Sequence, residues 1–263
     1  MYPILWQDDG LLLPTWHVTY CIASIVSYFV LHHLTRYHHR YSSFQTDWLY
    51  IYLYLSGYLG ARAWGYVFEG MDGHHFLLMG PMTFYGGFIG CTTVGLLYIL
   101  YYGRSFYGYV PSALISGFCG LAIGRIGCFL NGDDFGISIS PSNPFYFLTV
   151  VFPHHLHPLP RLPVQLFESS GALVIFLVGF LKYSTLIRAL GPLRMSLHLA
   201  SSYAILRGLL EFIRDDDRGQ LVSFGISHAQ GISLLILSIT FFFEGLIWGK
   251  KKLSLTSSHS CQI

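Results

Sequence analysis

The chain has 263 residues, of which 53% are hydrophobic, 17% aromatic and only 11% charged. This composition is too apolar for an ordinary soluble domain and predicts a polytopic membrane protein. The formal net charge of +2, with basic residues dispersed among the loops, argues against a nucleic-acid-binding surface.

Seven apolar segments are each long enough to cross about 30 Å of hydrocarbon as a helix. They occupy residues 13–35, 48–68, 82–102, 110–131, 163–181, 194–213 and 229–249. Between the fourth and fifth segments lies a long loop, 132–162, in which five prolines argue against a continuous helix. We see no repeat or second domain, so we predict one all-α transmembrane bundle over residues 1–263.

Basic residues are distributed unequally between the two ends of the predicted helices. Cytoplasmic loops of membrane proteins are enriched in lysine and arginine. One side has three such residues, Arg161, Arg214 and Arg218. The other side has nine: Arg36, Arg40, Arg104, Lys182, Arg188, Arg194, Lys250, Lys251 and Lys252. We therefore predict that the N-terminus and the loops 69–81, 132–162 and 214–228 lie outside, and that the tail 250–263 is cytoplasmic.

A glycine-rich segment, Gly124–Gly136, ends the fourth apolar segment and enters the long loop. Its Arg125 lies well inside the predicted helix, where an arginine costs about 2.5–3.5 kcal/mol on insertion scales. The glycines at 124, 127, 132 and 136 permit close approach of backbones or of a ligand. Asn131, Asp133 and Asp134 add polar groups at the helix exit. An arginine that is kept inside an apolar helix despite this insertion cost, next to glycines and polar residues, indicates a functional site.

Five charged side chains are predicted at one depth, near the outer ends of their helices: Arg62, Arg125, Glu168, Arg207 and Glu211. Charges inside a bilayer usually face the bundle interior or a water-filled cavity and pair with one another. A common depth therefore predicts one polar chamber that opens toward the outer leaflet. Gln165 lies one turn before Glu168, and Arg207, Glu211 and Arg214 are spaced i, i+4 and i+7 on one stripe.

Two interpretations of these charges are open. Arg207 and Glu211 alone could form a structural ion pair that binds nothing. However, three arginines at this depth exceed two glutamates, and a guanidinium without a carboxylate partner is suited to bidentate hydrogen bonding with phosphate. The surplus of positive charge therefore predicts a site for an anionic lipid headgroup.

Five segments resemble the motifs of the prolipoprotein diacylglyceryl transferase family, and together they extend over nearly the whole chain. Gly124–Gly136 is similar to the family signature Gly-Arg-x-Gly-(Asn or Cys)-Phe-x-Asn-Gly-x-x-x-Gly. Met82–Gly87 is similar to the family's Met-Ser-Phe-His-Gly-Gly, and Pro163–Glu168 is similar to its Pro-Ser-Gln-Leu-Tyr-Glu. Near the end of the chain, Arg207–Arg214 is similar to Arg-Phe-x-x-Glu-Phe-x-Arg, and Ile226–Gln230 is similar to Leu-Ser-Met-Gly-Gln.

The resemblance implies transfer of the diacylglyceryl group of phosphatidylglycerol to the lipobox cysteine thiol of an exported prolipoprotein precursor, with release of glycerol phosphate. It implies a location in the bacterial cytoplasmic membrane among membrane lipids, and no cofactor or metal. Arg125 and Arg207 would hold the phosphate. Catalytic roles are expected for His17, Tyr85, Arg125, Asn131, Asp133, Arg207 and Glu211. Substrate contacts are expected for Arg62, Gly86, Gly87, Cys128, Gly136, Gln165, Glu168, Arg214 and Gln230.

Two positions depart from the family pattern as if exchanged. Tyr85 stands where the family has a histidine before the glycine pair, and His17 stands where it has a tyrosine after the tryptophan. Leu162 replaces another histidine, and Asp133 is the acidic residue of the signature. Tyrosine has an ordinary pKa of about 10 and histidine of about 6.5, so a histidine is the better base for a thiol at neutral pH.

Two hypotheses follow from this exchange. In the first, His17 takes over deprotonation of the thiol and Tyr85 orients a headgroup oxygen. In the second, the chain is a repurposed paralogue that binds phosphatidylglycerol without this chemistry, or transfers its glyceryl group to another acceptor. A transporter would need charges along a path to both faces, which the clustering at one depth disfavours.

The histidine-rich stretches have a simpler interpretation. His32, His33, His38 and His39 lie at the inner end of the first helix, where we expect a basic patch against anionic lipid rather than a metal site. His154, His155 and His157 lie in the proline-rich outer loop and are interpreted as surface residues rather than as a metal site.

Overall fold

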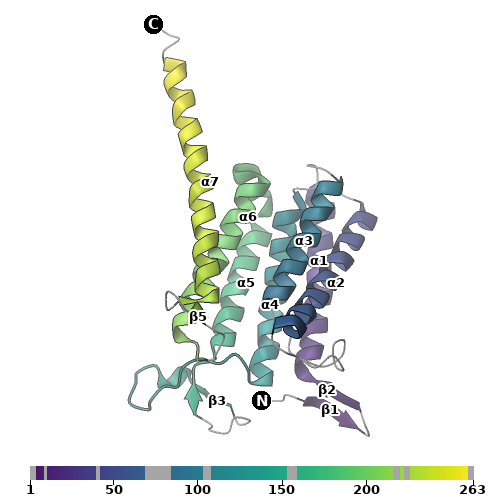
Figure 1. The fold of residues 1–263 in the computed structure, drawn as a ribbon, viewed down its shortest axis with the longest axis vertical. Coiled ribbons are helices and arrows are strands. Elements are labelled where there is room, and N and C mark those ends of the chain that lie inside the picture. Colours follow the sequence, from purple (N-terminus) through teal and green to yellow (C-terminus); the bar gives the residue numbers. More distant parts are fainter. Residues whose placement is uncertain are drawn as a thin grey trace. The chain divides into compact units, whose positions relative to one another are not determined.

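The computed structural model describes residues 4–8, 11–39, 42–68, 84–102, 108–152, 159–215, 220–221 and 226–259 (Figure 1). These residues form seven α-helices: α1 (Thr15–His39), α2 (Ser43–Phe68), α3 (Phe84–Tyr102), α4 (Tyr109–Asn131), α5 (Val164–Leu181), α6 (Tyr183–Leu210) and α7 (His228–His259). Two short 3-10 helices are also present: η3 (Tyr146–Leu148) and η4 (Glu211–Ile213). The strands form three antiparallel pairs: β1 (Ile4–Asp8) with β2 (Leu11–Pro14), β3 (Val150–Val151) with β4 (Pro160–Arg161), and β5 (Gln220–Leu221) with β6 (Ile226–Ser227).

Most of the described helices are apolar, and some have the length and composition of membrane spans. Four of them, α1, α4, α5 and the Ala229–Gly249 part of α7, are long and apolar enough to cross a membrane, and α3 contributes a shorter apolar stretch, Gly86–Tyr102. In α2 and α6 the tyrosines and arginines lower the mean hydropathy. The chain is therefore a helical integral membrane protein.

Several predicted helix boundaries are wrong because hydropathy marks the apolar part of a helix rather than its hydrogen-bonded ends. The structure begins α2 at Ser43 and continues α7 to His259. It begins α6 at Tyr183, with a break at Gly191 (φ 75°, ψ 169°) just before Pro192. The same helix ends at Leu210, so Glu211 belongs to η4 rather than to the predicted α-helix.

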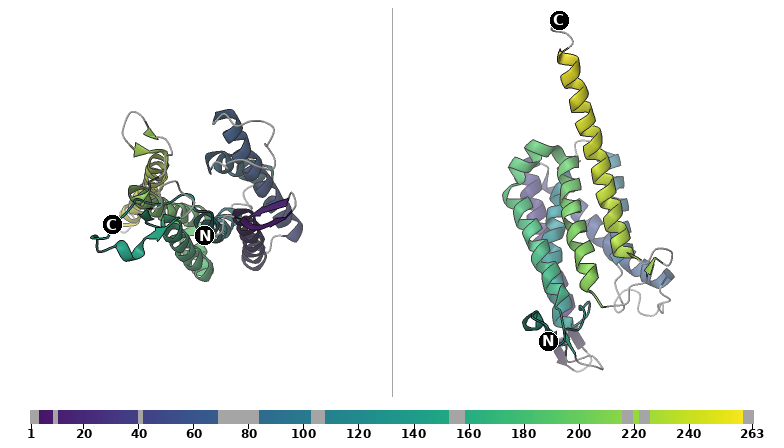
Figure 2. Two further views of the ribbon diagram at one scale, coloured as in Figure 1. Left: turned by 90° about the horizontal axis from the view of Figure 1, so that it is seen from below. Right: turned by 90° about the vertical axis from the view of Figure 1, so that its left-hand side faces the viewer.

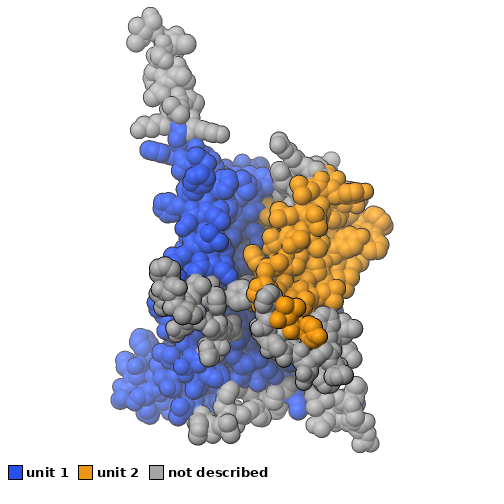
Figure 3. All heavy atoms as spheres, viewed as in Figure 1, with its two compact units in different colours: residues 1–27, 114–263 blue, residues 28–113 orange. Residues whose placement is uncertain are grey.

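The chain divides into two compact units (Figure 3): unit 1 comprises residues 1–27 and 114–263, and unit 2 comprises residues 28–113. In unit 1, α5 packs against α6 and α6 against α7 (Figures 1 and 2). The first half of α1 packs against α4, where Ser27 and Ser116 donate hydrogen bonds to each other's carbonyl oxygens at 3.0 and 2.7 Å. Gly127 faces Thr19 on α1 so closely that a Cβ would collide with its hydroxyl.

In unit 2, glycines bring α2 and α3 together. A Cβ on Gly60 would collide with the carbonyl oxygen of Gly86, and a Cβ on Gly90 would collide with that of Ser56. Small residues allow membrane helices to approach at the level of their backbones. The structure thus gives Gly86 a packing role, and a Cβ on Gly87 would also lie 3.3 Å from the oxygen of Gly57. Their assignment to substrate contacts stays a prediction.

A polar contact joins α6 to α7 within unit 1. The guanidinium of Arg194 donates two hydrogen bonds to Glu244, at 2.7 and 2.6 Å, and His198 lies 3.2 Å from the same carboxylate. Ser201 and Thr240 form a further buried hydrogen bond of 2.8 Å. Arg194 was counted from the sequence among the basic residues at one side of the helices, as the first residue of the sixth; in the structure it lies inside α6.

Candidate functional site

The exit of α4 turns the chain back toward Arg125. Gly132 has φ 90°, and the amides of Gly132 and Asp133 both donate to the carbonyl of Cys128, at 2.9 and 3.3 Å. This is the left-handed helix end that glycine permits without a Cβ penalty. Asp134 also has a positive φ, 63°, a conformation that aspartate tolerates better than most residues. The turn places the Asp134 carboxylate against the guanidinium of Arg125.

Gly136 fixes the next part of this loop between two other segments of unit 1. Its amide donates to the carbonyl of Leu162 at 2.9 Å, and the amide of Ile137 donates to that of Ile213 at 2.9 Å. A Cβ on Gly136 would lie 2.6 Å from the Ile213 oxygen and 2.9 Å from the Leu162 oxygen. Only glycine fits here, and it brings the signature loop beside the residues that follow α6.

Four side chains form a buried ion cluster where these segments meet. Arg125 pairs with Asp134 through one terminal nitrogen and with Glu168 through the other. Arg214 lies 2.9 Å from Asp134 and 3.7 Å from Glu168. The side chains of Glu168 and Arg214 are 1% and 3% exposed, whereas that of Asp134 is 21% exposed. Each carboxylate therefore bridges the two arginines, and Asp134 is the more accessible of the two.

Two further side chains of α6 belong to this group. The hydroxyl of Tyr203 donates to Glu168 at 2.6 Å. Arg207 pairs with Glu211 at 2.5 Å and also interacts electrostatically with Glu168. Tyr203, Arg207 and Glu211 are spaced by four residues, so they lie along one side of the chain as α6 ends.

Among the described residues of unit 1, positive and negative charges are equal in number at this site. Arg125, Arg207 and Arg214 are balanced there by three carboxylates, Asp134, Glu168 and Glu211. The sequence count omitted Asp134, which lies in the loop after α4, and Arg214, which was placed on the stripe with Arg207 and Glu211 but not counted. The arginines are thus neutralised by the protein itself, and an incoming anion has to compete with a carboxylate.

Polar groups around the cluster retain open hydrogen-bonding capacity. Gln165 is fully buried and donates through Nε2 to the carbonyl of Asp133 at 2.5 Å. Among the described residues, its Oε1 accepts no hydrogen bond and the buried Nε of Arg125 donates none. Cys128 lies 3.7 Å from the Arg125 guanidinium. The Asp133 carboxylate instead accepts a hydrogen bond from Asn131 at 2.7 Å at the surface.

Arg161 was counted as a loop charge from the sequence and proves to hold the loop in place. Its guanidinium lies 4.4 Å from the centre of the Phe135 ring, donates to the carbonyl of Gly136 at 3.3 Å and pairs with Asp215. Phe135 follows Asp134, and Asp215 follows Arg214. Arg161 therefore connects the two segments that carry Asp134 and Arg214, the carboxylate and the guanidinium that these loops supply to the cluster.

Two predicted site residues, Arg62 and Tyr85, lie on different helices of unit 2. Arg62 is fully buried on α2, with its guanidinium carbon 5.4 Å from the centre of the Tyr58 ring. Tyr85 lies in the first turn of α3, immediately before Gly86. The prediction that these residues share one chamber with Arg125 stays a prediction.

His17 and Gln230 lie at the starts of helices in unit 1. The His17 ring is partly buried in the first turn of α1 and stacks on Trp16, with 3.6 Å between ring centres. Gln230 accepts a hydrogen bond from the amide of Ser227 at 3.0 Å, while the Ser227 hydroxyl accepts one from the amide of Gln230 at 3.2 Å. This reciprocal capping box starts α7, so the Gln230 side chain has a structural role, and its predicted substrate contact stays a prediction.

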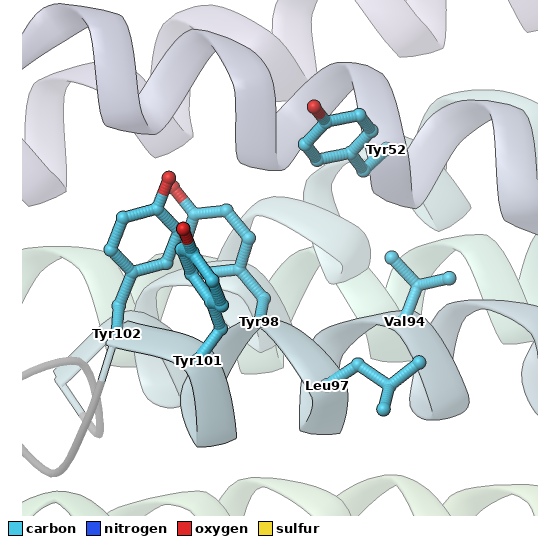
Figure 4. Close-up of a pocket in the computed structure, with 6 residues that line it drawn as sticks. All are labelled: Tyr52, Val94, Leu97, Tyr98, Tyr101 and Tyr102. Carbon is cyan, nitrogen blue, oxygen red and sulfur yellow. The ribbon is translucent and has the colours of Figure 1, made fainter.

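Among the described residues, no group of three or more His, Cys, Asp and Glu side chains is placed to hold a metal ion. His154, His155 and His157 lie outside the described residues. A pocket of about 360 Å³ in unit 2 is lined by Tyr52 of α2 and, on α3, by Val94, Leu97, Tyr98, Tyr101 and Tyr102 (Figure 4). Its lining has hydroxyl groups but no charge, so it lacks the chemistry of a phosphate site.

Comparison with known proteins agrees with the motifs. Residues 3–245 match the family model described as prolipoprotein diacylglyceryl transferase. The chain is similar to proteins named phosphatidylglycerol–prolipoprotein diacylglyceryl transferase from Ralstonia pickettii (28% identity, covering 66% of this chain and 64% of the relative) and Vibrio atlanticus (34%, 66% and 60%). A third relative of the same name, from Nitrobacter hamburgensis, is 36% identical over 52% of this chain and 46% of the relative. The chain thus spans about half to two thirds of the length of these relatives.

Proposed function

Since the chain belongs to the prolipoprotein diacylglyceryl transferase family, we propose that it transfers the diacylglyceryl group of phosphatidylglycerol to the cysteine thiol of an exported lipoprotein precursor. The second product is glycerol phosphate. The names of the similar proteins from Ralstonia and Vibrio specify this lipid and this acceptor. We place the reaction at the outer side of the bacterial cytoplasmic membrane, in accord with the distribution of basic residues.

The observation that supports this proposal best is the bridge that Asp134 makes between Arg125 and Arg214. A carboxylate and a phosphate present similar pairs of oxygens to a guanidinium. Asp134 is more exposed than Glu168, so the phosphate of the lipid takes its place while Glu168 continues to align both arginines. Arg207, which interacts with Glu168, adds a third positive charge beside the same phosphate.

The chemistry is a displacement at carbon. The thiolate sulfur attacks the glyceryl carbon that carries the phosphate ester, an S–C bond forms, and the C–O bond breaks with its electron pair going to the phosphate oxygen. Negative charge therefore grows on the leaving phosphate, where preorganised guanidinium groups stabilise the transition state. Glu168, which orients both Arg125 and Arg214, is already in position before substrate binds.

The thiol must also lose its proton, because the thiolate is the nucleophile. We assign this step to His17 as general base, with Tyr85 orienting a headgroup oxygen through its hydroxyl. The open Oε1 of the buried Gln165 is suited to accept a hydrogen bond from a headgroup hydroxyl. Glycerol supplies such hydroxyls, which a bare phosphate monoester lacks.

The experiment that tests the proposal is formation of a thioether on a lipobox peptide by the purified protein in phosphatidylglycerol vesicles. Mass spectrometry should find the diacylglyceryl adduct on the cysteine and an equal amount of glycerol phosphate. A matched peptide with serine in place of cysteine should remain unmodified. Binding of phosphatidylglycerol without any thioether product would contradict the transfer proposal and favour the second candidate, a repurposed lipid-binding paralogue, which the exchange of His17 and Tyr85 motivates.

A further inference from the structure

The segment 137–152 of unit 1 combines a well-defined backbone with exposed apolar side chains. It follows the signature loop and contains η3, and its sequence has no Lys, Arg, Asp or Glu. Phe147 is 78% exposed and Phe145 59%, values comparable with Phe241 on the apolar helix α7, at 84%. Tyr146, Leu148 and Val151 of the same segment are exposed as well. A water-soluble loop would not concentrate such side chains on its surface.

The backbone of this segment satisfies many of its own hydrogen bonds. The amides of Asn143, Tyr146, Leu148 and Thr149 donate to carbonyls three residues earlier, at 2.9 to 3.0 Å. The amide of Phe145 donates to the side chain of Asn143 at 2.9 Å, and the Thr149 hydroxyl donates to the carbonyl of Tyr146 at 2.7 Å. Backbone polar groups that are paired internally remove the main cost of approaching hydrocarbon.

The segment is connected at both sides to helices that can cross a membrane. It lies between α4 and α5, both of which have the length and apolar composition of membrane spans. Figure 1 shows its teal ribbon extending sideways from the lower ends of these two helices. A sideways extension at the end of a membrane helix runs along the lipid surface.

We propose that residues 145–148 and Val151 form an interfacial anchor that inserts its aromatic side chains into the lipid headgroup region beside unit 1. Aromatic rings favour this region because they present an apolar body and, in tyrosine, a polar edge. The absence of charge in the sequence 137–152 suits lipid better than a charged protein partner. The patch is also small, since a specific protein interface uses about 20–30 residues a side. This anchor would fix the height of the signature loop at the membrane surface.

The test places the photoreactive residue p-benzoylphenylalanine at Phe147 or, as a matched control on the same loop, at the exposed Asn143. Each purified variant is reconstituted in phosphatidylglycerol and phosphatidylethanolamine nanodiscs and illuminated, and adducts are identified by mass spectrometry. We expect lipid adducts at position 147 to exceed those at position 143 several-fold. Both side chains are on the surface. Because Asn143 accepts a hydrogen bond from the Phe145 amide, each variant is used only if it unfolds at the temperature of the unmodified protein.

Three outcomes would overturn the anchor. Equal and low lipid labelling at both positions would place Phe147 in water. A covalent dimer would identify a second copy of the chain as the partner. Movement of the cross-link from lipid to an added lipobox peptide with an apolar segment would make the patch a precursor-docking surface. None of these readouts depends on transfer activity, so failure of the anchor is distinguishable from failure of the proposed function.

Discussion

Asp133 and Asp134 are adjacent residues with different partners, and this difference decides their roles. The Asp134 carboxylate bridges Arg125 and Arg214, whereas that of Asp133 accepts a hydrogen bond from Asn131 at the surface. The family signature indicated Asp133 as the acidic residue of the site. The structure adds Asp134 as the carboxylate that bridges the two arginines, and under the proposed function the lipid phosphate displaces it.

We therefore expect Asp134→Asn to strengthen binding of glycerol phosphate on the order of tenfold, because a charge-assisted hydrogen bond contributes about 1.5–3 kcal/mol and each 1.4 kcal/mol is tenfold in affinity. Isothermal titration with the purified protein measures this change. Asp133→Asn is the matched control and should leave the affinity unchanged. An increase for Asp133→Asn alone would place Asp133, rather than Asp134, at the phosphate.

Removal of an arginine should affect activity and stability differently at the two predicted phosphate ligands. Arg125→Ala and Arg207→Ala should each lower transfer by about a hundredfold or more, since each removes a charged donor to the leaving phosphate. Arg125→Ala also leaves Glu168 and Asp134 without their main partner, and breaking a buried ion pair costs about 3–5 kcal/mol.

Thermal unfolding in detergent should therefore show a larger loss of stability for Arg125→Ala than for Arg207→Ala, because the second change leaves only one carboxylate, Glu211, without its ion-pair partner. The control is Arg188→Ala, which removes an exposed arginine of the same helix as Arg207. It should change neither quantity. Full transfer activity in both site variants would show that these arginines do not hold the phosphate.

The exchange of His17 and Tyr85 permits a test of the base. His17→Ala should abolish transfer while phosphatidylglycerol still binds, and transfer by the unmodified protein should fall as the pH is lowered and imidazole becomes protonated. The double change His17→Tyr with Tyr85→His should retain more activity than either single change, because groups that act together are not additive. Unimpaired transfer by His17→Ala would remove the base assignment.

Of the residues that meet in unit 1, the sequence singled out Arg125, Glu168, Arg207 and Arg214, but it did not identify Asp134 as their partner or Arg161 as a support of the loop. Arg125, Glu168 and Arg207 stand out because a charge in an apolar segment is rare. Asp134 and Arg161 lie in polar surroundings, where a charge is ordinary, and only the turns at Gly132 and Gly136 bring them to the cluster. Tyr203 could have been found from its spacing of four residues before Arg207.

At the scale of elements, Gly136 holds the signature loop against the end of α6. Gly136→Ala should lower stability by about 1–3 kcal/mol, because its Cβ would meet two backbone oxygens that cannot move independently. Arg214 directly follows Ile213, so a shift of the backbone at Ile213 would move Arg214 and should also reduce transfer. Gly124→Ala in the same signature is the matched control, since no atom lies within 4 Å of its Cβ.

Thermal unfolding and thioether formation should be measured for both glycine variants. We expect Gly124→Ala to match the unmodified protein or to be slightly more stable, because alanine favours a helix by about 1 kcal/mol over glycine. Equal effects of the two substitutions would mean that the close approach at Gly136 does not position the loop.

Hydropathy predicted the seven α-helices found among the described residues but not their ends. The apolar part of α2 begins after its polar first turn, and the break at Gly191 and Pro192 hides the first piece of α6. The glycine contacts between α2 and α3 were not predictable either, since a glycine in an apolar segment can serve a helix contact or a ligand equally well. Their helical spacing becomes informative only when the facing helix is known.

At the scale of the whole molecule, the orientation in the membrane decides which compartment meets the ion cluster. Arg194 pairs with Glu244 inside the helices, and Arg214 is 3% exposed in the cluster. Without these two residues, the count of basic loop residues changes from nine and three to eight and two. The asymmetry remains, so the residues that follow α4 should lie outside.

A cysteine in place of Asn143, which is exposed in the loop after α4, should react in intact cells with a thiol reagent that cannot cross membranes. A cysteine in place of Ser257, near the end of α7, should react only after the cells are permeabilised. The unmodified protein, with five cysteines of its own, sets the background for both. The reverse pattern would turn Arg125, Asp134 and Glu168 toward the cytoplasm, where an exported precursor no longer presents its thiol. Such a result would therefore contradict the proposed acceptor even if the cluster binds phosphatidylglycerol, because lipid binding does not depend on orientation and access to the precursor does.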